Sequence, residues 1–216
     1  MKDDWPEITP ALLLRAYASG VFPMAESADA AETFWVDPKR RGILPLDALH
    51  VSRSLRRTLT RGGFEIRVDT AFGAVVDACA DRPETWINAD IKGLYRALNR
   101  MGRAHSVEVW MEDELAGGLY GVALGGAFFG ESMFSRRPDA SKIALVALVA
   151  RLRAGGFRLL DTQFVTDHLA RLGAIEISRQ AYHERLREAI NRPADFQALP
   201  RDASPQRLLQ LSTQMS

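Results

Sequence analysis

The sequence contains one cysteine, Cys79, among its 216 residues. A single thiol cannot form an internal disulfide, nor can it supply a cysteine-rich zinc site. No apolar run approaches the roughly 20 residues that a membrane-spanning helix needs. The first ten residues, MKDDWPEITP, are acidic and polar, unlike a secretory leader. We therefore expect a cytoplasmic protein that neither crosses a membrane nor depends on disulfides.

A strong overall charge is also missing, because the formal net charge is only +1. The charges are nevertheless uneven: residues 1–38 carry two basic and seven acidic side chains, whereas residues 39–67 carry eight basic and two acidic ones. The eight basic side chains are Lys39, Arg40, Arg41, Arg53, Arg56, Arg57, Arg61 and Arg67. A local belt of arginines indicates either contact with a polyanion or an ordinary solvated helix face.

Three parts of the chain differ in regularity. Residues 1–62 combine two short helices with proline-containing loops, and they predict a small N-terminal domain. Residues 63–190 run strand, two helices, three strands, helix, strand, helix, strand, helix. This order predicts an α+β domain with a mixed sheet and helices on both faces. It matches the GCN5-related N-acetyltransferase fold, in which the sheet splays open to admit the acyl donor. Residues 191–216 are polar and predict a loosely held tail.

Two predicted strand ends carry polar side chains beside large apolar ones. In a regular strand, Phe129, Glu131 and Met133 share one face, and Asp161 and Gln163 share a face of another strand. A carboxylate among apolar side chains is costly to bury unless it meets a cation. We expect a cleft that binds a cation through its acids and an apolar group through its walls. The alternative is that Glu131 is simply exposed at the end of a sheet.

Other chemistries find little support. Cys79 lies in an apolar helical run and is predicted to be a buried structural thiol. The histidines show no spacing to acids or cysteine that suits a metal, so no metal is predicted. Coenzyme-A-dependent acyltransferases hold the pyrophosphate on a glycine-containing loop before a helix. The corresponding segment, SRRPDASKIA, has a proline and an aspartate but no glycine, which disfavours coenzyme A.

Two tryptophans, Trp35 and Trp86, lie in proline-containing loops. Such side chains can stack on a nucleic-acid base, or they can cap the core from outside. The sequence leaves these two interpretations about even for Trp86. It favours a structural role for Trp35.

Several segments together resemble the leucyl/phenylalanyl-tRNA–protein transferase family. They include AYASGVFPM, HVSRSLRR, AHSVEVW, FFGESMFSR and LLDTQFVTDHLARLGA, and they extend from about Leu12 to Leu186. The resemblance implies an enzyme that moves leucine, phenylalanine or methionine from aminoacyl-tRNA to the N-terminal Arg or Lys of an acceptor protein. This modification marks the acceptor for degradation. No cofactor is implied, because the aminoacyl ester is already activated.

The resemblance also implies roles for individual residues. Asp161 and Gln163 match the catalytic pair, in which Gln163 accepts from the attacking amine and Asp161 orients it. Glu131 matches the acid that meets the positive side chain of the acceptor. Adenosine and the aminoacyl group are expected on Trp86, Tyr95, Trp35, Met24, Phe128, Phe129, Met133 and Leu145. The tRNA phosphates are expected on Arg40, Arg41, Arg53, Arg56, Arg57 and Arg61.

Two departures from the family pattern concern tRNA contact. Met24 stands where the family has a tryptophan after Phe-Pro, which leaves Trp35 as a candidate substitute for stacking. The chain also lacks the glycine-rich stretch that often precedes the first helix. Two other hypotheses stay open on the sequence: a coenzyme-A-dependent N-acyltransferase and a non-catalytic RNA-binding module.

Overall fold

The structure is a computed structural model that describes residues 8–30, 32–201 and 203–213. The chain begins with helix α1 (Pro10–Ala18), where Thr9 accepts a hydrogen bond from the Leu12 N–H, as a Thr-Pro pair predicts. Strands β1 (Phe22–Ala25) and β2 (Thr33–Val36) then form a separate antiparallel hairpin.

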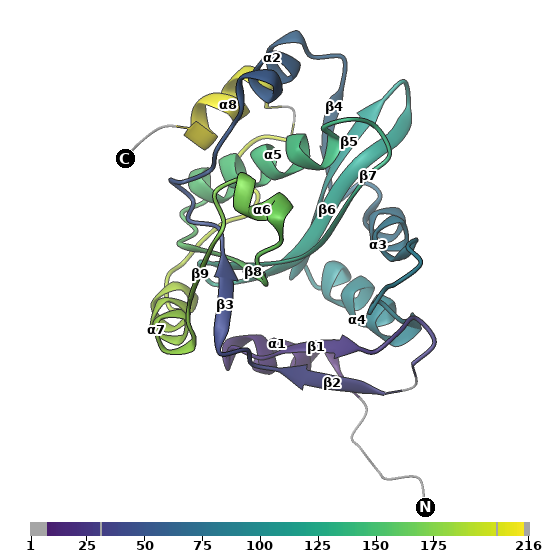
Figure 1. Cartoon of the computed structure of the whole chain (residues 1–216), viewed down its shortest axis with the longest axis vertical. Helices are drawn as coiled ribbons and strands as arrows, with labels where there is room; N and C mark the ends of the chain where they lie inside the picture. Colours follow the sequence, from purple (N-terminus) through teal and green to yellow (C-terminus); the bar gives the residue numbers. More distant parts are fainter. Residues whose placement is uncertain (1–7, 31, 202, 214–216) are drawn as a thin grey trace, which may run out of the picture.

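The main sheet has seven strands in the order β4-β5-β6-β7-β8-β3-β9. Neighbouring strands are antiparallel except β7 and β8, which are parallel, so the sheet is mixed as predicted. Its strands are β3 (Arg40–Ile43), β4 (Glu65–Val68), β5 (Ala104–Met111), β6 (Glu114–Leu124), β7 (Ala127–Ser135), β8 (Leu159–Gln163) and β9 (Ile175–Ser178). Strand β3 precedes residue 62, yet it lies between the two last strands, so residues 1–62 contribute directly to the main sheet (Figure 1).

Helices cover both faces of this sheet, which confirms the predicted layering (Figure 1). One face packs against α2 (Arg53–Arg61), α5 (Ala140–Ala154) and α8 (Pro205–Thr213). The other packs against α1, α3 (Phe72–Ala80), α4 (Ala89–Arg100) and α7 (Arg179–Ile190). Helix α5 is buried along nearly its whole length, because its side chains are apolar on all sides. No helix in the described ranges combines the length and apolarity needed to cross a membrane.

The end of the chain differs from the predicted loose tail. Phe196, Leu199 and Leu208 are buried in the core on the α5 face. The buried guanidinium of Arg151 donates hydrogen bonds to the carbonyls of Phe196 and Leu199 at 3.0 and 2.6 Å. The composition of the segment concealed these few apolar anchors among polar residues. Over the described residues, the tail is therefore part of the folded domain.

Strands β7 and β8 pair over only a short distance and then separate. The parallel pairing joins Ala127–Phe129 to Leu159–Asp161 and extends no further. Strand β7 continues to Ser135, and β8 continues to Gln163. The two strand ends that carry the candidate polar residues therefore part from each other, as the sequence analysis expected of this region.

Candidate active site

Each of the two parting strands carries an extra residue at the point of separation. On β7, Gly130 and Ser132 pair with consecutive residues of β6, so Glu131 has no partner of its own. On β8, Asp161 and Gln163 pair with consecutive residues of β3, so Thr162 is the extra residue. Such β-bulges bend a strand and redirect side chains, and they are common next to active sites.

The bulge at Glu131 corrects the predicted alternation of β7. Phe129 lies on the face covered by α1 and α4, and Glu131 reaches the same side, as predicted. Met133 instead packs against the core on the opposite face. The prediction that Phe129, Glu131 and Met133 share one face is therefore wrong for Met133, because it assumed a regular strand.

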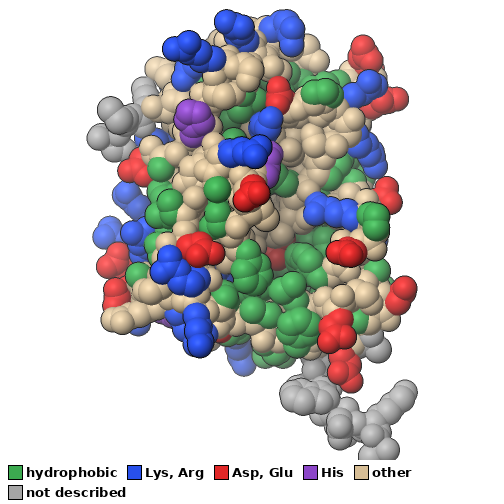
Figure 2. Space-filling model, viewed as in Figure 1, with side chains coloured by type: hydrophobic (Ala, Val, Ile, Leu, Met, Phe, Trp, Pro, Cys, Tyr) green, Lys and Arg blue, Asp and Glu red, His purple; other side chains and the backbone are tan. Residues whose placement is uncertain are grey.

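A pocket of about 370 Å³ opens where the two strands part. Residues 130–133 of β7 line one wall, and residues 162–164 line the other. Most of the remaining lining is apolar: Phe22, Met24, Trp86, Leu119, Leu145, Leu148, Leu160 and Leu169. In the space-filling view, hydrophobic side chains gather in the lower middle of the face of the molecule that is drawn (Figure 2). Such a pocket can take an apolar group and present a few polar groups to it.

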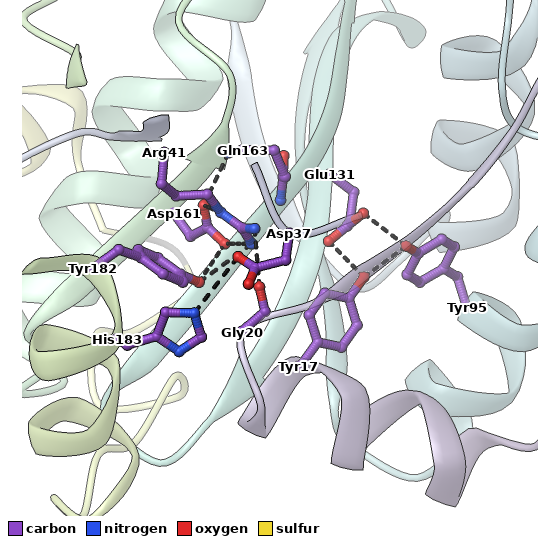
Figure 3. Close-up of polar contacts among 10 residues, drawn as sticks. All are labelled: Tyr17, Gly20, Asp37, Arg41, Tyr95, Glu131, Asp161, Gln163, Tyr182 and His183. Carbon is purple, nitrogen blue, oxygen red and sulfur yellow. Dashed lines mark hydrogen bonds and ion pairs between the residues drawn. The ribbon is translucent and has the colours of Figure 1, made fainter. Parts of the chain in front are cut away.

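Glu131 is buried in this pocket and is held by two tyrosine hydroxyls. Tyr17 donates to one carboxylate oxygen at 2.7 Å and Tyr95 to the other at 2.6 Å (Figure 3). Burial raises the pKa of Glu131 to about 7, although both tyrosine hydrogen bonds act in the opposite direction. The sequence predicted a cation as the partner of this acid, but two tyrosine hydroxyls contact the carboxylate instead.

Asp161 lies outside the lining of the pocket, and its carboxylate accepts several hydrogen bonds (Figure 3). Its carboxylate accepts from Arg41 Nε at 2.9 Å and from Arg41 Nη2 at 2.6 Å, in a bidentate pair with both side chains almost fully buried. It also accepts from the Tyr182 hydroxyl at 2.8 Å and from the Gln163 backbone N–H at 2.9 Å. Burial opposes the charge on Arg41, but the hydrogen bonds and charge of Asp161 raise its pKa.

Gln163 ends β8 with a left-handed backbone conformation, φ 55°. This conformation is uncommon for a side chain other than glycine, asparagine or aspartate. The bond from its N–H to Asp161 supports it, and Gly42 on β3 leaves room for the neighbouring backbone. The Gln163 side chain lines the pocket beside Glu131 (Figure 3). Asp161 does not line it, so the two residues do not face the pocket together.

Three buried side-chain polar atoms in the described part of the chain have no hydrogen-bond partner. They are the Tyr120 hydroxyl, Thr162 Oγ1 and Gln163 Nε2. All three residues line the same pocket. Because buried polar groups are nearly always satisfied in a folded protein, these three atoms are polar groups that the pocket offers to water or to a ligand.

The other predicted pocket residues divide into two groups. Met24, Trp86, Met133 and Leu145 line the pocket. Phe128, Phe129, Tyr95 and Trp35 do not line it. The two phenylalanines are fully buried on opposite faces of the sheet, Tyr95 donates a hydrogen bond to Glu131, and Trp35 lies partly exposed on β2.

The predicted phosphate-binding arginines also divide. Arg53, Arg56, Arg57 and Arg61 are exposed on α2, and none of them forms an ion pair within the described ranges. Arg40 is exposed and pairs with Glu176 at 3.4 Å. Arg41 is 1% exposed and fully engaged with Asp161, so its predicted contact with tRNA phosphate is wrong.

Sequence reasoning missed several residues around the site. Tyr17 donates a hydrogen bond to Glu131, and Tyr182 donates one to Asp161. His168 and Arg82 line the pocket. The cost of burying an acid signalled that Glu131 needed partners, but nothing in the spacing pointed to Tyr17. Cys79 is buried as predicted, and burial raises its pKa to about 12. No cluster of three or more His, Cys, Asp or Glu in the described residues is placed to hold a metal ion.

Comparisons with known proteins agree with the sequence resemblance. The family model described as leucyl/phenylalanyl-tRNA protein transferase matches residues 43–187, and the model of that family's N-terminal domain matches residues 6–39. Curated proteins named leucyl/phenylalanyl-tRNA–protein transferase are similar over most of the chain. The protein from Roseobacter denitrificans is 61% identical over 97% of this chain and 99% of its own length. Those from Ruegeria sp. and Paramagnetospirillum magneticum are 64% and 66% identical over 95% and 88% of this chain, and 97% and 92% of their own lengths.

Proposed function

The chain belongs to the leucyl/phenylalanyl-tRNA protein transferase family and is an aminoacyltransferase, and we propose that it moves leucine, phenylalanine or methionine from aminoacyl-tRNA to the N-terminal Arg or Lys of an acceptor protein. The product would carry a new N-terminal residue that marks it for degradation in the cytoplasm. The observation that carries this proposal is the pocket between β7 and β8, where the three unpartnered buried polar atoms lie around an apolar wall.

The apolar part of the pocket suits the side chain of the transferred residue. Leu145, Leu148, Leu160 and Met133 form much of this wall and offer no polar group to the side chain. A hydrophobic pocket distinguishes ligands that differ by one methylene by only about 1–3 kcal/mol. We therefore expect leucine, phenylalanine and methionine to be accepted together.

Glu131 is the group best placed to meet the positive side chain of the acceptor. It is the acidic residue among those lining the pocket. A bound guanidinium or ammonium favours the ionised carboxylate, so the acceptor would lower the pKa of about 7 that Glu131 has in the free protein. Tyr17 and Tyr95 then keep the carboxylate oriented. This arrangement supports a preference for Arg and Lys at the acceptor N-terminus.

The transfer itself forms one bond and breaks another. The unprotonated α-amine of the acceptor attacks the carbonyl carbon of the aminoacyl ester. The new C–N bond forms, the ester C–O bond to the terminal ribose breaks, and the amine proton passes to the departing ribose oxygen. Gln163 is within the same pocket and can hold the amine by accepting its hydrogen through the amide oxygen.

Asp161 supports this step from outside the pocket. Its oxygens already accept four hydrogen bonds, from Arg41, Tyr182 and the Gln163 backbone. The carboxylate is therefore not free to take a proton from the substrate. We therefore assign it a positioning role, in which it fixes the backbone of Gln163.

Helix α2 offers a surface for the rest of the tRNA. Its four exposed arginines lie outside the pocket and have no acidic partners among the described residues, and phosphate contacts of this type position a nucleic acid with little base readout. Lys and Arg side chains are prominent at this end of the molecule in Figure 2.

One assay tests the proposal directly. The protein is incubated with labelled leucyl-tRNA and a peptide that begins with Arg, without ATP, and label on the peptide is measured. Matched reactions use a peptide beginning with Ala and acetyl-coenzyme A as the donor. We expect label only on the Arg peptide and only from leucyl-tRNA. Absence of transfer with tRNA binding retained would instead support an RNA-binding module.

A further inference from the structure

A second pocket of about 480 Å³ adjoins the first. The two pockets share the lining residues Arg82, Met133 and His168. The second pocket is lined further by Ser135, Arg136 and Ser141, at the end of β7 and the start of α5. The transferase chemistry of the first pocket makes no use of these residues.

The second pocket has an excess of positive charge. Neither Arg82 nor Arg136 forms an ion pair with an acidic side chain among the residues described. Arg82 donates to Ser132 Oγ at 3.2 Å and to the Met133 carbonyl. Arg136 donates to the Leu115 carbonyl at 3.4 Å and leaves its other nitrogens available. Asp81 is the acidic residue in the lining.

Asp139, at the start of α5, does not cancel this charge. The sequence alone indicates that an aspartate here repels a phosphate. Its carboxylate accepts from Lys142 at 2.8 Å and from the Thr58 hydroxyl at 3.5 Å, and it is absent from the lining of the pocket. Because Lys142 neutralises Asp139 and Thr58 of α2 also contacts it, Asp139 does not offset the positive charge of the arginines that line the pocket.

The contact between Thr58 and Asp139 places α2 near the second pocket. It joins α2 to the start of α5, beside the second pocket. Asp139 lies two residues before Ser141, which lines the second pocket, so α2 contacts the segment that borders this pocket.

We infer that the second pocket binds the phosphodiester group nearest the 3′ end of the tRNA, the one that joins the last two nucleotides. This inference rests on the proposed function. With the aminoacyl ester in the first pocket, that phosphodiester is the first anionic group of the donor. Arg82 and Arg136 supply charged donors to its oxygens, and the Ser141 hydroxyl supplies a neutral one; the Ser135 hydroxyl already donates to the Arg137 carbonyl at 2.8 Å.

The test compares two donors that differ in this phosphodiester: leucyl-tRNA, and 3′-O-leucyl-adenosine, which has no phosphate. Arg136→Gln removes a charge that belongs to the second pocket and not to the first. Arg136→Lys keeps the charge, and Arg100→Gln, at the exposed end of α4, is the matched control. KM and kcat are measured for each donor with the Arg peptide, over a range of salt concentrations.

We expect Arg136→Gln to raise the KM for leucyl-tRNA about tenfold or more, since a charged hydrogen bond is lost. It should lower the slope of log affinity against log salt by about 0.7. The KM for leucyl-adenosine should change less than twofold, Arg136→Lys should recover part of the loss, and Arg100→Gln should resemble the unmodified protein.

Three outcomes overturn the inference. One is an equal loss with both donors, and another is no loss with either. The third is competition by coenzyme A that disappears in Arg136→Gln, which would assign the pocket to a pyrophosphate. Failure of the unmodified protein to transfer from both donors would instead remove the proposed function, so the two failures are distinguishable.

Discussion

Arg41 and Asp161 form a bidentate ion pair at 2.6 and 2.9 Å, and both side chains are almost completely buried. The Arg41 guanidinium also lies between the rings of Phe22 and Tyr182, 4.4 Å from each centroid. It donates to the Gly20 carbonyl at 3.0 Å as well. One side chain thus joins α7, the β1 hairpin and the strand end that carries Gln163.

Removing the cation from this pair should destabilise the fold. Arg41→Met leaves the Asp161 carboxylate buried without its partner, and we expect the free energy of unfolding to fall by about 3–5 kcal/mol. Denaturant unfolding measures this change. Arg40→Met is the matched control, because the Arg40 side chain is 62% exposed and its pair with Glu176 is worth less than about 1 kcal/mol. Equal effects of the two substitutions would contradict a special role for Arg41.

Asp161→Asn should slow transfer while leaving donor binding intact. The substitution removes the charge that faces Arg41 and weakens the bond that holds the Gln163 backbone, so we expect kcat to fall about 100-fold through misplacement. The KM for leucyl-tRNA should be nearly unchanged, because Asp161 does not line the pocket.

The same prediction has a sharper form in the double variant. If Asp161 acts only through Gln163, then Asp161→Asn should have no further effect on kcat in a Gln163→Ala background. Independent, additive losses would show that Asp161 has a separate role in the reaction.

The use of Arg acceptors should depend on the ionisation of Glu131. Its pKa is about 7, so kcat/KM for the Arg peptide should rise as pH increases through that value and the carboxylate ionises. Tyr17→Phe removes a donor to the carboxylate and should move this rise to higher pH. In Glu131→Gln, kcat/KM should no longer rise near pH 7, and the remaining increase with pH should be the one caused by deprotonation of the peptide amine. The Arg peptide should also bind more weakly at every pH. A pH profile of Glu131→Gln identical to that of the unmodified protein would remove Glu131 from the acceptor site.

The same carboxyl group should make stability depend on pH. A folded pKa of about 7, against an ordinary value of 4.5, means that the folded state holds this proton more tightly than the unfolded chain. The stability that the proton contributes is full below pH 4.5 and is lost as pH rises through 7, by about 3 kcal/mol. Glu131→Gln should therefore become more stable relative to the unmodified protein between pH 5 and pH 8. Thermal or denaturant unfolding across this range measures the difference, and a constant difference would refute the shift.

Gly42→Ala should disturb the strand end that holds Gln163. A Cβ at this position would lie 2.7 Å from the Phe164 carbonyl carbon and 2.8 Å from Thr162 Oγ1. We expect a loss of about 1–3 kcal/mol in unfolding free energy, with a fall in transfer rate. Gly93→Ala is the control: no atom lies within 4 Å of its added Cβ, and alanine should stabilise α4 by about 1 kcal/mol. Gly42→Ala with full stability and activity would show that the close approach is dispensable.

Local patterns in the sequence predicted much of the fold, because capping and periodicity are local properties. At Thr9, Ser52 and Thr166, the side chain accepts a hydrogen bond from the first turn of the helix, as is typical of serine and threonine at this position. The helix at 72–80 is an exception, because its N-cap residue is Ala71, which has no side-chain hydrogen bond to offer. Glu108 accepts from the Thr70 and Ala71 N–H groups instead.

The details of the site depend on long-range contacts that no local pattern contains. The parting of β7 and β8 followed from the order of elements, but the bulges at Glu131 and Thr162 did not. Period-two alternation therefore failed at the two positions where side-chain direction matters most. Arg41 was misassigned for a similar reason: an arginine in a basic stretch looks exposed until the strand 120 residues later is placed beside it.

The position of β3 ties completion of the active site to completion of the chain. Arg41 emerges early during synthesis, yet its strand is flanked on both edges by β8 and β9, which emerge near the end. Until residues 159–163 have left the ribosome, β3 has no neighbour in the sheet, and until residue 178 has followed, one edge of β3 is still unpaired. A translation product interrupted before β8 would thus lack the strand that carries Asp161 and Gln163, and Arg41 would lack its ion-pair partner.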